Sequence, residues 1–344
     1  MGNNQEIIVR IRRTLLNKKM TQRDLAVALG KKEAEISRWM NGRMGISNPN
    51  LQKIEDILET ALTENSLARE KQAYLRLGVI GTGSIAKRFV EETVYVPNVY
   101  VASAYNPNFA ETHQFCEMYG IMNEAINVEE LLKEVDAVYI ASPCYSHFEY
   151  IQKALNANKH VLCETPLTDN YPQAKELVGL AKKLGLVLMP ALKTAYAPSF
   201  SKIIEEALSG EIGEIVDVSA TVTTLLSQEV TLGYNNERLR DNLYYAMLII
   251  LKLLGLDFKK VSAFARNDGS KSLYLNASLI YDNMIGQAIV GTGVKSESSL
   301  VISGTKGYIY VPAPWWKTEY FEVRFEDMNK TEKYFYKFDG DGLR

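Results

Sequence analysis

The sequence contains few of the residues that bind metals or form disulfides: three cysteines and three histidines among 344 residues. Three cysteines cannot build the disulfide framework of a secreted protein, and three histidines leave little for a metal site. The N-terminus lacks the apolar core of a signal peptide, and no apolar run approaches the roughly 18 residues that a membrane helix needs. We therefore predict a soluble, cytoplasmic protein with no metal and no membrane partner.

The charge is nearly balanced, at −2 overall, and 47% of the residues are hydrophobic, which excludes disorder as the main state. The length predicts two or three domains. Residues 1–74 hold 13 Lys and Arg against 9 Asp and Glu, whereas the remainder holds 26 against 32. A basic end on an acidic body hints at a nucleic-acid partner.

Residues 1–62 show the pattern of a small all-α domain. Apolar side chains recur at helical spacing over 7–18, 21–30, 32–41 and 50–61. Thr21 stands at an N-cap position with Asp24 three residues on, and Gly30 is a natural C-terminal glycine. Two short helices joined by a glycine turn and braced by two others predict a helix-turn-helix domain.

Met20–Arg43, MTQRDLAVALGKKEAEISRWMNGR, resembles the Cro/repressor-like (XRE) helix-turn-helix family. The resemblance implies that helix 32–41 enters the major groove of DNA. It places Lys32, Glu33, Ala34 and Arg38 at base-facing positions, and Gln22 and Arg43 at phosphate-contacting ones. Such units can instead mediate only protein contacts. Because the fold normally binds two half-sites, we also expect a homo-oligomer.

Residues 63–74 are polar and are predicted to be a linker, after which a dinucleotide-binding pattern begins. The apolar strand 75–80 leads into Gly81, Thr82 and Gly83, and then a helical pattern opens with Ser84, Ile85 and Ala86. The glycines permit a tight turn and close approach of a pyrophosphate at a helix N-terminus. Strands and helices then alternate, with strands over 100–104, 137–141, 160–163 and 187–189. This alternation predicts a doubly wound parallel (Rossmann) sheet over 75–192.

The second strand lacks the expected acidic ending. It closes on Ala104, Tyr105 and Asn106, where Asp or Glu would hold the adenosine ribose. Asn106 can hydrogen-bond a ribose, but we expect no carboxylate and no arginine to be available there. The choice between NAD and NADP is therefore left open.

Residues 75–340 resemble the Gfo/Idh/MocA oxidoreductase family. The resemblance rests on LGVIGTGSIA, DAVYIASPCYSHFEYIQKALNANKHVLCETPL, SGEIGEIVDVSA and VISGTKGYIYVPAPWWKTEYFEVRFED. It implies NAD or NADP near Ser142, Pro143, His147 and Glu164. It also implies that residues 193–344 form an α+β open-sheet domain that binds a sugar-like molecule. Independently, the sequence predicts strands over 214–225, 259–266, 272–281, 284–291, 298–303 and 307–311.

The catalytic pattern of that family is incomplete. The family's Glu-Lys-Pro reads Glu164-Thr165-Pro166, so Thr165 replaces the cation. The resemblance assigns the acid/base position to Tyr245, with Asp241 four residues before it. Lys193 is a candidate substitute for the missing charge. A tyrosine is a slow base unless a cation lowers its pKa.

Three hypotheses follow. The chain is a transcriptional regulator whose oxidoreductase-like body senses a cofactor or a sugar-like ligand, an active sugar or cyclitol oxidoreductase that uses Tyr245 with Lys193, or a relic with neither activity. The resemblance also implies a closing helix after FDGDGLR, which we expect to be absent here. Its absence would leave apolar surface for a partner or another domain to cover, and a truncated reading frame would look the same.

Overall fold

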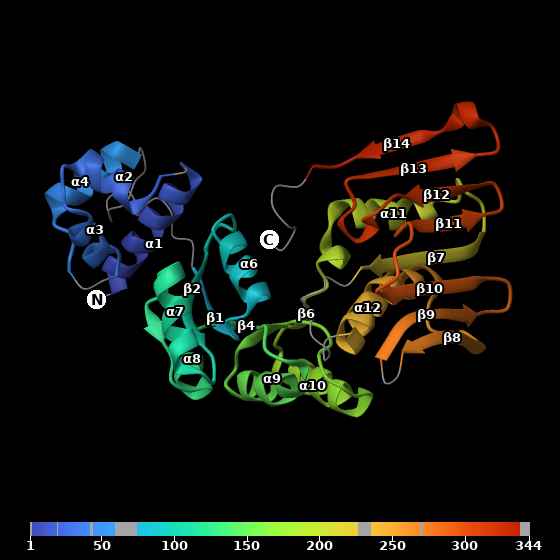
Figure 1. Ribbon diagram of the computed structural model, residues 1–344, viewed down its shortest axis with the longest axis horizontal. Helices are drawn as coiled ribbons and strands as arrows, with labels where there is room; N and C mark the ends of the chain where they lie inside the picture. The colour runs from blue at the N-terminus through green and yellow to red at the C-terminus, as the bar shows by residue number, and fades with distance from the viewer. Residues whose placement is uncertain are drawn as a thin grey trace. The chain divides into compact units, whose positions relative to one another are not determined.

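The computed structural model describes residues 2–18, 20–41, 44–58, 74–225, 235–268 and 271–337 (Figure 1). The chain divides into two compact units between Ala191 and Leu192. Within the described ranges, no helix is long and apolar enough to cross a membrane. The predicted absence of a closing helix concerns residues beyond 337, which lie outside these ranges.

The N-terminal domain consists of α1 (Gly2–Asn17), α2 (Gln22–Leu29), α3 (Glu33–Met40) and α4 (Asn48–Leu58). Thr21 and Asp24 form the predicted capping box: the Thr21 hydroxyl accepts from the Asp24 amide, and the Asp24 carboxylate accepts from the Thr21 amide at 2.7 Å. Gly30 ends α2 in the left-handed conformation at φ 64°. A core that includes Ile36 and Trp39 holds the four helices together.

The dinucleotide-binding domain has a parallel sheet in the order β3-β2-β1-β4-β5-β6. Its strands are β1 (Leu75–Ile80), β2 (Val99–Tyr105), β3 (Asn123–Glu124), β4 (Ala137–Ile140), β5 (His160–Cys163) and β6 (Leu188–Pro190). Its helices are α6 (Ser84–Thr93), α7 (Phe109–Tyr119), α8 (Val128–Glu134), α9 (His147–Asn156) and α10 (Tyr171–Leu184). The predicted doubly wound sheet is confirmed.

Alternating strand residues build two cores, one on each face of this sheet. Val79 and Tyr139 pack in the cluster that includes α6 and α7, whereas Ile80, Val138 and Ile140 pack in the cluster that includes α8, α9 and α10. Both faces are therefore covered, and only the ends of the strands are left for ligands.

The second unit contains an eight-stranded mixed sheet in the order β14-β13-β12-β11-β7-β10-β9-β8. Its elements are α11 (Pro198–Leu208), β7 (Ile215–Thr224), α12 (Asn235–Leu254), β8 (Lys260–Asp268), β9 (Lys271–Ile280), β10 (Ile285–Thr292), β11 (Leu300–Gly304), β12 (Gly307–Val311), β13 (Tyr320–Phe325) and β14 (Glu332–Phe335). Both helices contribute to one core with the sheet, through Phe200 of α11 and Ile250 of α12. The predicted strands over 214–311 are present, and β13 and β14 extend the sheet beyond them.

Candidate cofactor site and DNA-binding surface

The turn between β1 and α6 has the shape that a pyrophosphate requires. Gly81 has φ +97°, and a Cβ there would lie 2.5 Å from the carbonyl oxygen of Ala141, so only glycine fits. Gly83 is the N-cap of α6, and a Cβ there would meet nothing within 4 Å. The first turn of α6, at Ser84 and Ile85, thus begins beside open space. Backbone N–H groups at such a helix N-terminus bind phosphate.

The end of β2 lies beside a carboxylate, that of Glu111, which the sequence pattern did not predict. The Asn106 side chain donates to the Thr82 hydroxyl at 2.7 Å and to the Glu111 carboxylate at 3.1 Å. Asn108, the N-cap of α7, donates to the other Glu111 oxygen at 3.0 Å. The prediction that no carboxylate is available here was wrong. The N-cap and N3 spacing of Asn108 and Glu111 indicates a helix start, but it does not indicate the contact with Asn106.

His147 joins the loops that follow β4 and β5. It is 1% exposed, and its ring nitrogens lie 2.7 Å from the Pro166 carbonyl oxygen and 2.8 Å from that of Ser142. The structure therefore brings together three parts of the predicted cofactor site: the Ser142–Pro143 segment, His147 and the loop that begins at Glu164.

The loop Glu164–Pro166 is anchored although it lacks the lysine. The Glu164 amide donates to the Ile140 carbonyl at 2.9 Å, and the Tyr139 hydroxyl donates to the Glu164 carboxylate at 2.5 Å. Tyr139 is buried and stacks on Phe89 with ring centroids 3.7 Å apart; burial raises the pKa of its phenol, so it remains a donor. The half-buried Thr165 occupies the centre of this loop and carries no charge.

The other three catalytic candidates belong to the second unit. Lys193 lies in a short 3₁₀ helix, η2 (Lys193–Tyr196), after β6. Asp241 and Tyr245 lie one turn apart on α12 and are half-buried, and Tyr245 packs against the core of that unit. An i, i+4 spacing puts the carboxylate and the phenol on one helix face.

The predicted base-facing residues are all exposed, and they lie at the N-cap of α3 and along the helix. Ile36, Trp39 and Met40 are buried, whereas the base-facing candidates Lys32, Glu33, Ala34 and Arg38 are exposed. Gln22, at the start of α2, is exposed as well. Arg43 lies outside the described residues. The buried residues hold α3 against the domain core, so that its opposite side faces solvent.

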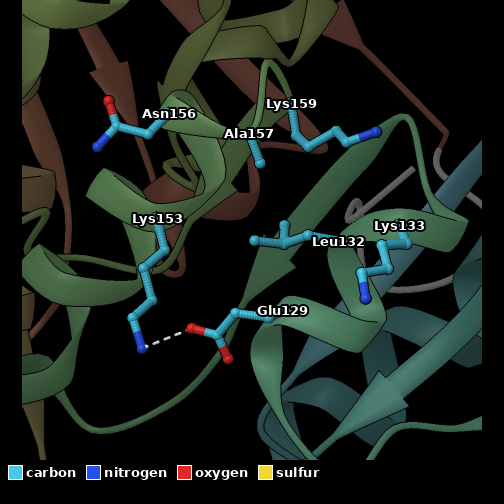
Figure 2. Close-up of a pocket in the computed structure, with 7 residues that line it drawn as sticks. All are labelled: Glu129, Leu132, Lys133, Lys153, Asn156, Ala157 and Lys159. Carbon is cyan, nitrogen blue, oxygen red and sulfur yellow. Dashed lines mark ion pairs between the residues drawn. The ribbon is translucent and has the colours of Figure 1, made fainter.

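A groove of about 570 Å³ lies between α8 and α9, where Lys153 forms an ion pair with Glu129 at 3.0 Å (Figure 2). Asn156 and Ala157 at the end of α9 line it, as does Lys159, which directly precedes β5. These residues lie toward the amino ends of the strands. The cofactor candidates lie at the carboxyl ends, where ligands of doubly wound sheets bind, so this groove is separate from the site.

Comparison with known proteins finds a family model for each of two segments of the chain. A family model described as "Oxidoreductase family, NAD-binding Rossmann fold" matches residues 75–192, and a helix-turn-helix model matches residues 11–65. Residues 75–192 are a Gfo/Idh/MocA oxidoreductase domain. A helix-turn-helix domain precedes it, and the matching oxidoreductase model describes an NAD-binding fold.

Sugar- and cyclitol-converting enzymes are among the relatives of this Gfo/Idh/MocA domain. A scyllo-inositol 2-dehydrogenase (NADP(+)) of Bacillus subtilis (strain 168) is 32% identical over 131 residues, 38% of this chain and 40% of that protein. A dTDP-3,4-didehydro-2,6-dideoxy-α-D-glucose 3-reductase of Streptomyces antibioticus is 26% identical over 263 residues, 73% of this chain and 80% of that one. The match to the inositol dehydrogenase thus spans less than half of its length.

Among solved structures, a 3-ketoreductase from Actinomadura kijaniata in complex with NADP and TDP-benzene is similar over 78% of this chain and 86% of that chain. Its TM-score is 0.68 at 25% identity. A UDP-N-acetylglucosamine 3-dehydrogenase from Acidithiobacillus ferrooxidans, at 20% identity and a TM-score of 0.69, supports the fold alone.

Proposed function

We propose that this protein is a DNA-binding transcriptional regulator whose NAD(P)-binding body senses a dinucleotide or a sugar-like ligand. The observation that carries the proposal is Thr165, a neutral residue at the centre of a cofactor loop that is otherwise held in place. The glycine turn, His147 and the Glu164 anchor are those of a binding site. A sensor needs to bind its ligand and does not need to transfer hydride.

The chemistry of hydride transfer makes the loss of the cation decisive. A bound nicotinamide supplies or accepts the hydride, and the protein must move a proton at the reacting hydroxyl. Loss of a general acid/base group lowers the rate by about 10²- to 10⁴-fold. Threonine carries no charge, so Thr165 supplies neither the proton nor the cation that a lysine would supply at this position.

The exposed side of α3 supports DNA as the partner. Arg38 lies one turn after Ala34 on this side, and an arginine in the major groove pairs with guanine through two hydrogen bonds. The test is a selection of bound duplexes from a random-sequence pool with the full chain, followed by binding of the Arg38→Ala variant to the selected duplex. We expect at least about a tenfold loss of affinity. Unaltered binding would refute the groove assignment.

Half-site recognition requires two copies, and we propose that the helix-free face of the eight-stranded sheet joins them. Phe264 of β8 is 65% exposed on this face, beside Asn276 and Ile289 on the next two strands. The Phe264→Glu variant should lower the mass measured by light scattering to that of a smaller assembly. An unchanged mass would place the contact elsewhere.

The alternative is an active sugar or cyclitol oxidoreductase that uses Tyr245 with Lys193. The i, i+4 placement of Asp241 and Tyr245 on α12 favours it, because the acidic residue and the phenol remain on one face. Steady-state oxidation of NADH and NADPH with a panel of keto-sugars distinguishes the two functions. Turnover that is lost in Tyr245→Phe would establish the enzyme, whereas the regulator predicts no turnover that depends on Tyr245.

A further inference from the structure

We infer that Glu111 completes the adenosine ribose site at the end of β2 and makes the domain selective for NAD over NADP. The inference rests on the proposed binding of a dinucleotide and goes beyond it by naming the residue that selects between the two cofactors. It starts from the contacts of Asn106, which occupies the first position after β2.

The Asn106 amide is fixed from three sides. Its nitrogen donates to Thr82 and to Glu111, and its oxygen accepts from the Asn108 amide at 2.9 Å. Thr82 lies between the two glycines of the phosphate turn and is only 6% exposed. The side-chain amide of Asn106 thus links the Glu111 carboxylate to the turn at which a pyrophosphate would bind.

Two asparagines orient this carboxylate while leaving it exposed. Asn106 and Asn108 each donate to a different oxygen of Glu111, at 3.1 and 3.0 Å. The residue itself is exposed on the first turn of α7. A carboxylate oxygen accepts more than one hydrogen bond, so both oxygens can still accept from ribose hydroxyls.

The segment that begins with β2 and ends with β3 supplies no lysine or arginine for a 2′-phosphate. From Phe89 to Leu132 there is no lysine or arginine, and this stretch contains β2, α7 and β3. An NADP site commonly places an arginine near the 2′-phosphate, whereas an acidic residue bonds the 2′-hydroxyl of NAD. Glu111 would attract the hydroxyl of NAD and repel the phosphate of NADP.

The experiment measures the dissociation constants of NADH and NADPH separately, by calorimetric titration of the full chain. The variants are Glu111→Gln, which keeps the shape and removes the charge, and Glu111→Lys, which reverses it. Glu117→Gln is the matched control, because Glu117 lies on the same helix and pairs with His113 rather than with Asn106.

The wild-type protein should bind NADH at least about tenfold more tightly than NADPH. Repulsion between the Glu111 carboxylate and the 2′-phosphate, in contact at an exposed site, weakens binding of NADPH by about that factor. Glu111→Gln should bring the dissociation constants of NADPH and NADH closer together, and Glu111→Lys should make NADPH the tighter ligand. Glu117→Gln should leave the ratio of the two constants unchanged. Equal or tighter binding of NADPH by the wild type, or an unchanged ratio in Glu111→Gln, would overturn the inference alone. Binding of neither dinucleotide would overturn both the inference and the proposed cofactor sensing.

Discussion

Replacement of Gly83 by valine should abolish dinucleotide binding while leaving the domain folded. The backbone of Gly83 is extended, at φ −71° and ψ −177°, a conformation that valine adopts without strain. A Cβ there has no protein atom within 4 Å. The added Cβ therefore meets no neighbour in the protein, and the valine side chain would extend into the space where a pyrophosphate would approach.

The Gly83→Val substitution should change the affinity for NADH much more than it changes the stability of the domain. Loss of a favourable N-cap residue lowers the free energy of unfolding by about 1 kcal/mol, a change that the two packed cores of this domain tolerate. The affinity for NADH should fall by at least about a hundredfold, which corresponds to roughly 2.7 kcal/mol. Thermal unfolding and calorimetric titration of the same preparation measure the two effects.

Gly179→Ala is the matched control for Gly83→Val. Gly179 lies inside α10, and a Cβ there also meets nothing within 4 Å. Alanine should raise helix stability by about 0.5–1 kcal/mol and leave NADH binding unchanged. If the Gly83→Val variant folds and still binds NADH with wild-type affinity, the assignment of the glycine turn as the phosphate site is refuted.

Three further predictions concern packing and charge. Trp39→Ala should lower the free energy of unfolding by about 3–5 kcal/mol and abolish DNA binding, because Trp39 is buried on the inner face of α3; circular dichroism and duplex titration check this. Gly286→Val should lower the melting temperature, since even a Cβ there would lie 2.3 Å from the Ile250 side chain. Hydrogen bonds from Arg76 lower the pKa of Asp136, so its stabilisation, present at neutral pH, should fade as acid protonates the carboxylate. Asp136→Asn should therefore destabilise by about 1 kcal/mol or less at pH 7, because the pair is partly exposed, and hardly at all in acid.

Much of the fold follows from local sequence signals. Thr21, Asp24 and Gly30 delimit α2 because capping depends on residues only a few positions apart. The dinucleotide-binding domain is equally predictable, since its strands are short apolar runs that alternate with helical patterns. Strands β13 and β14 mix charged and aromatic side chains without a regular alternation, so the pattern ending at residue 311 did not extend to them.

The candidate site was only partly predictable. Gly81 and Gly83 could be found because glycine is needed where a side chain would block the backbone. Glu111 was missed because its role depends on how Asn106 and Asn108 direct their amides, which the periodicity of the sequence does not specify. The anchoring of Glu164 by Tyr139 likewise joins β4 to the loop after β5 through a side-chain contact. Such contacts between elements appear only once the chain is folded.

The measurement that tests the central claim most directly is the affinity of the full chain for its selected duplex, with and without saturating NADH. A regulator that senses the cofactor must bind DNA differently in the two states, and coupling of the usual size changes the affinity by at least about fivefold. The Gly83→Val variant should bind DNA with an affinity that NADH does not alter. Equal affinities of the wild-type protein in the presence and absence of bound NADH would contradict regulation by the dinucleotide.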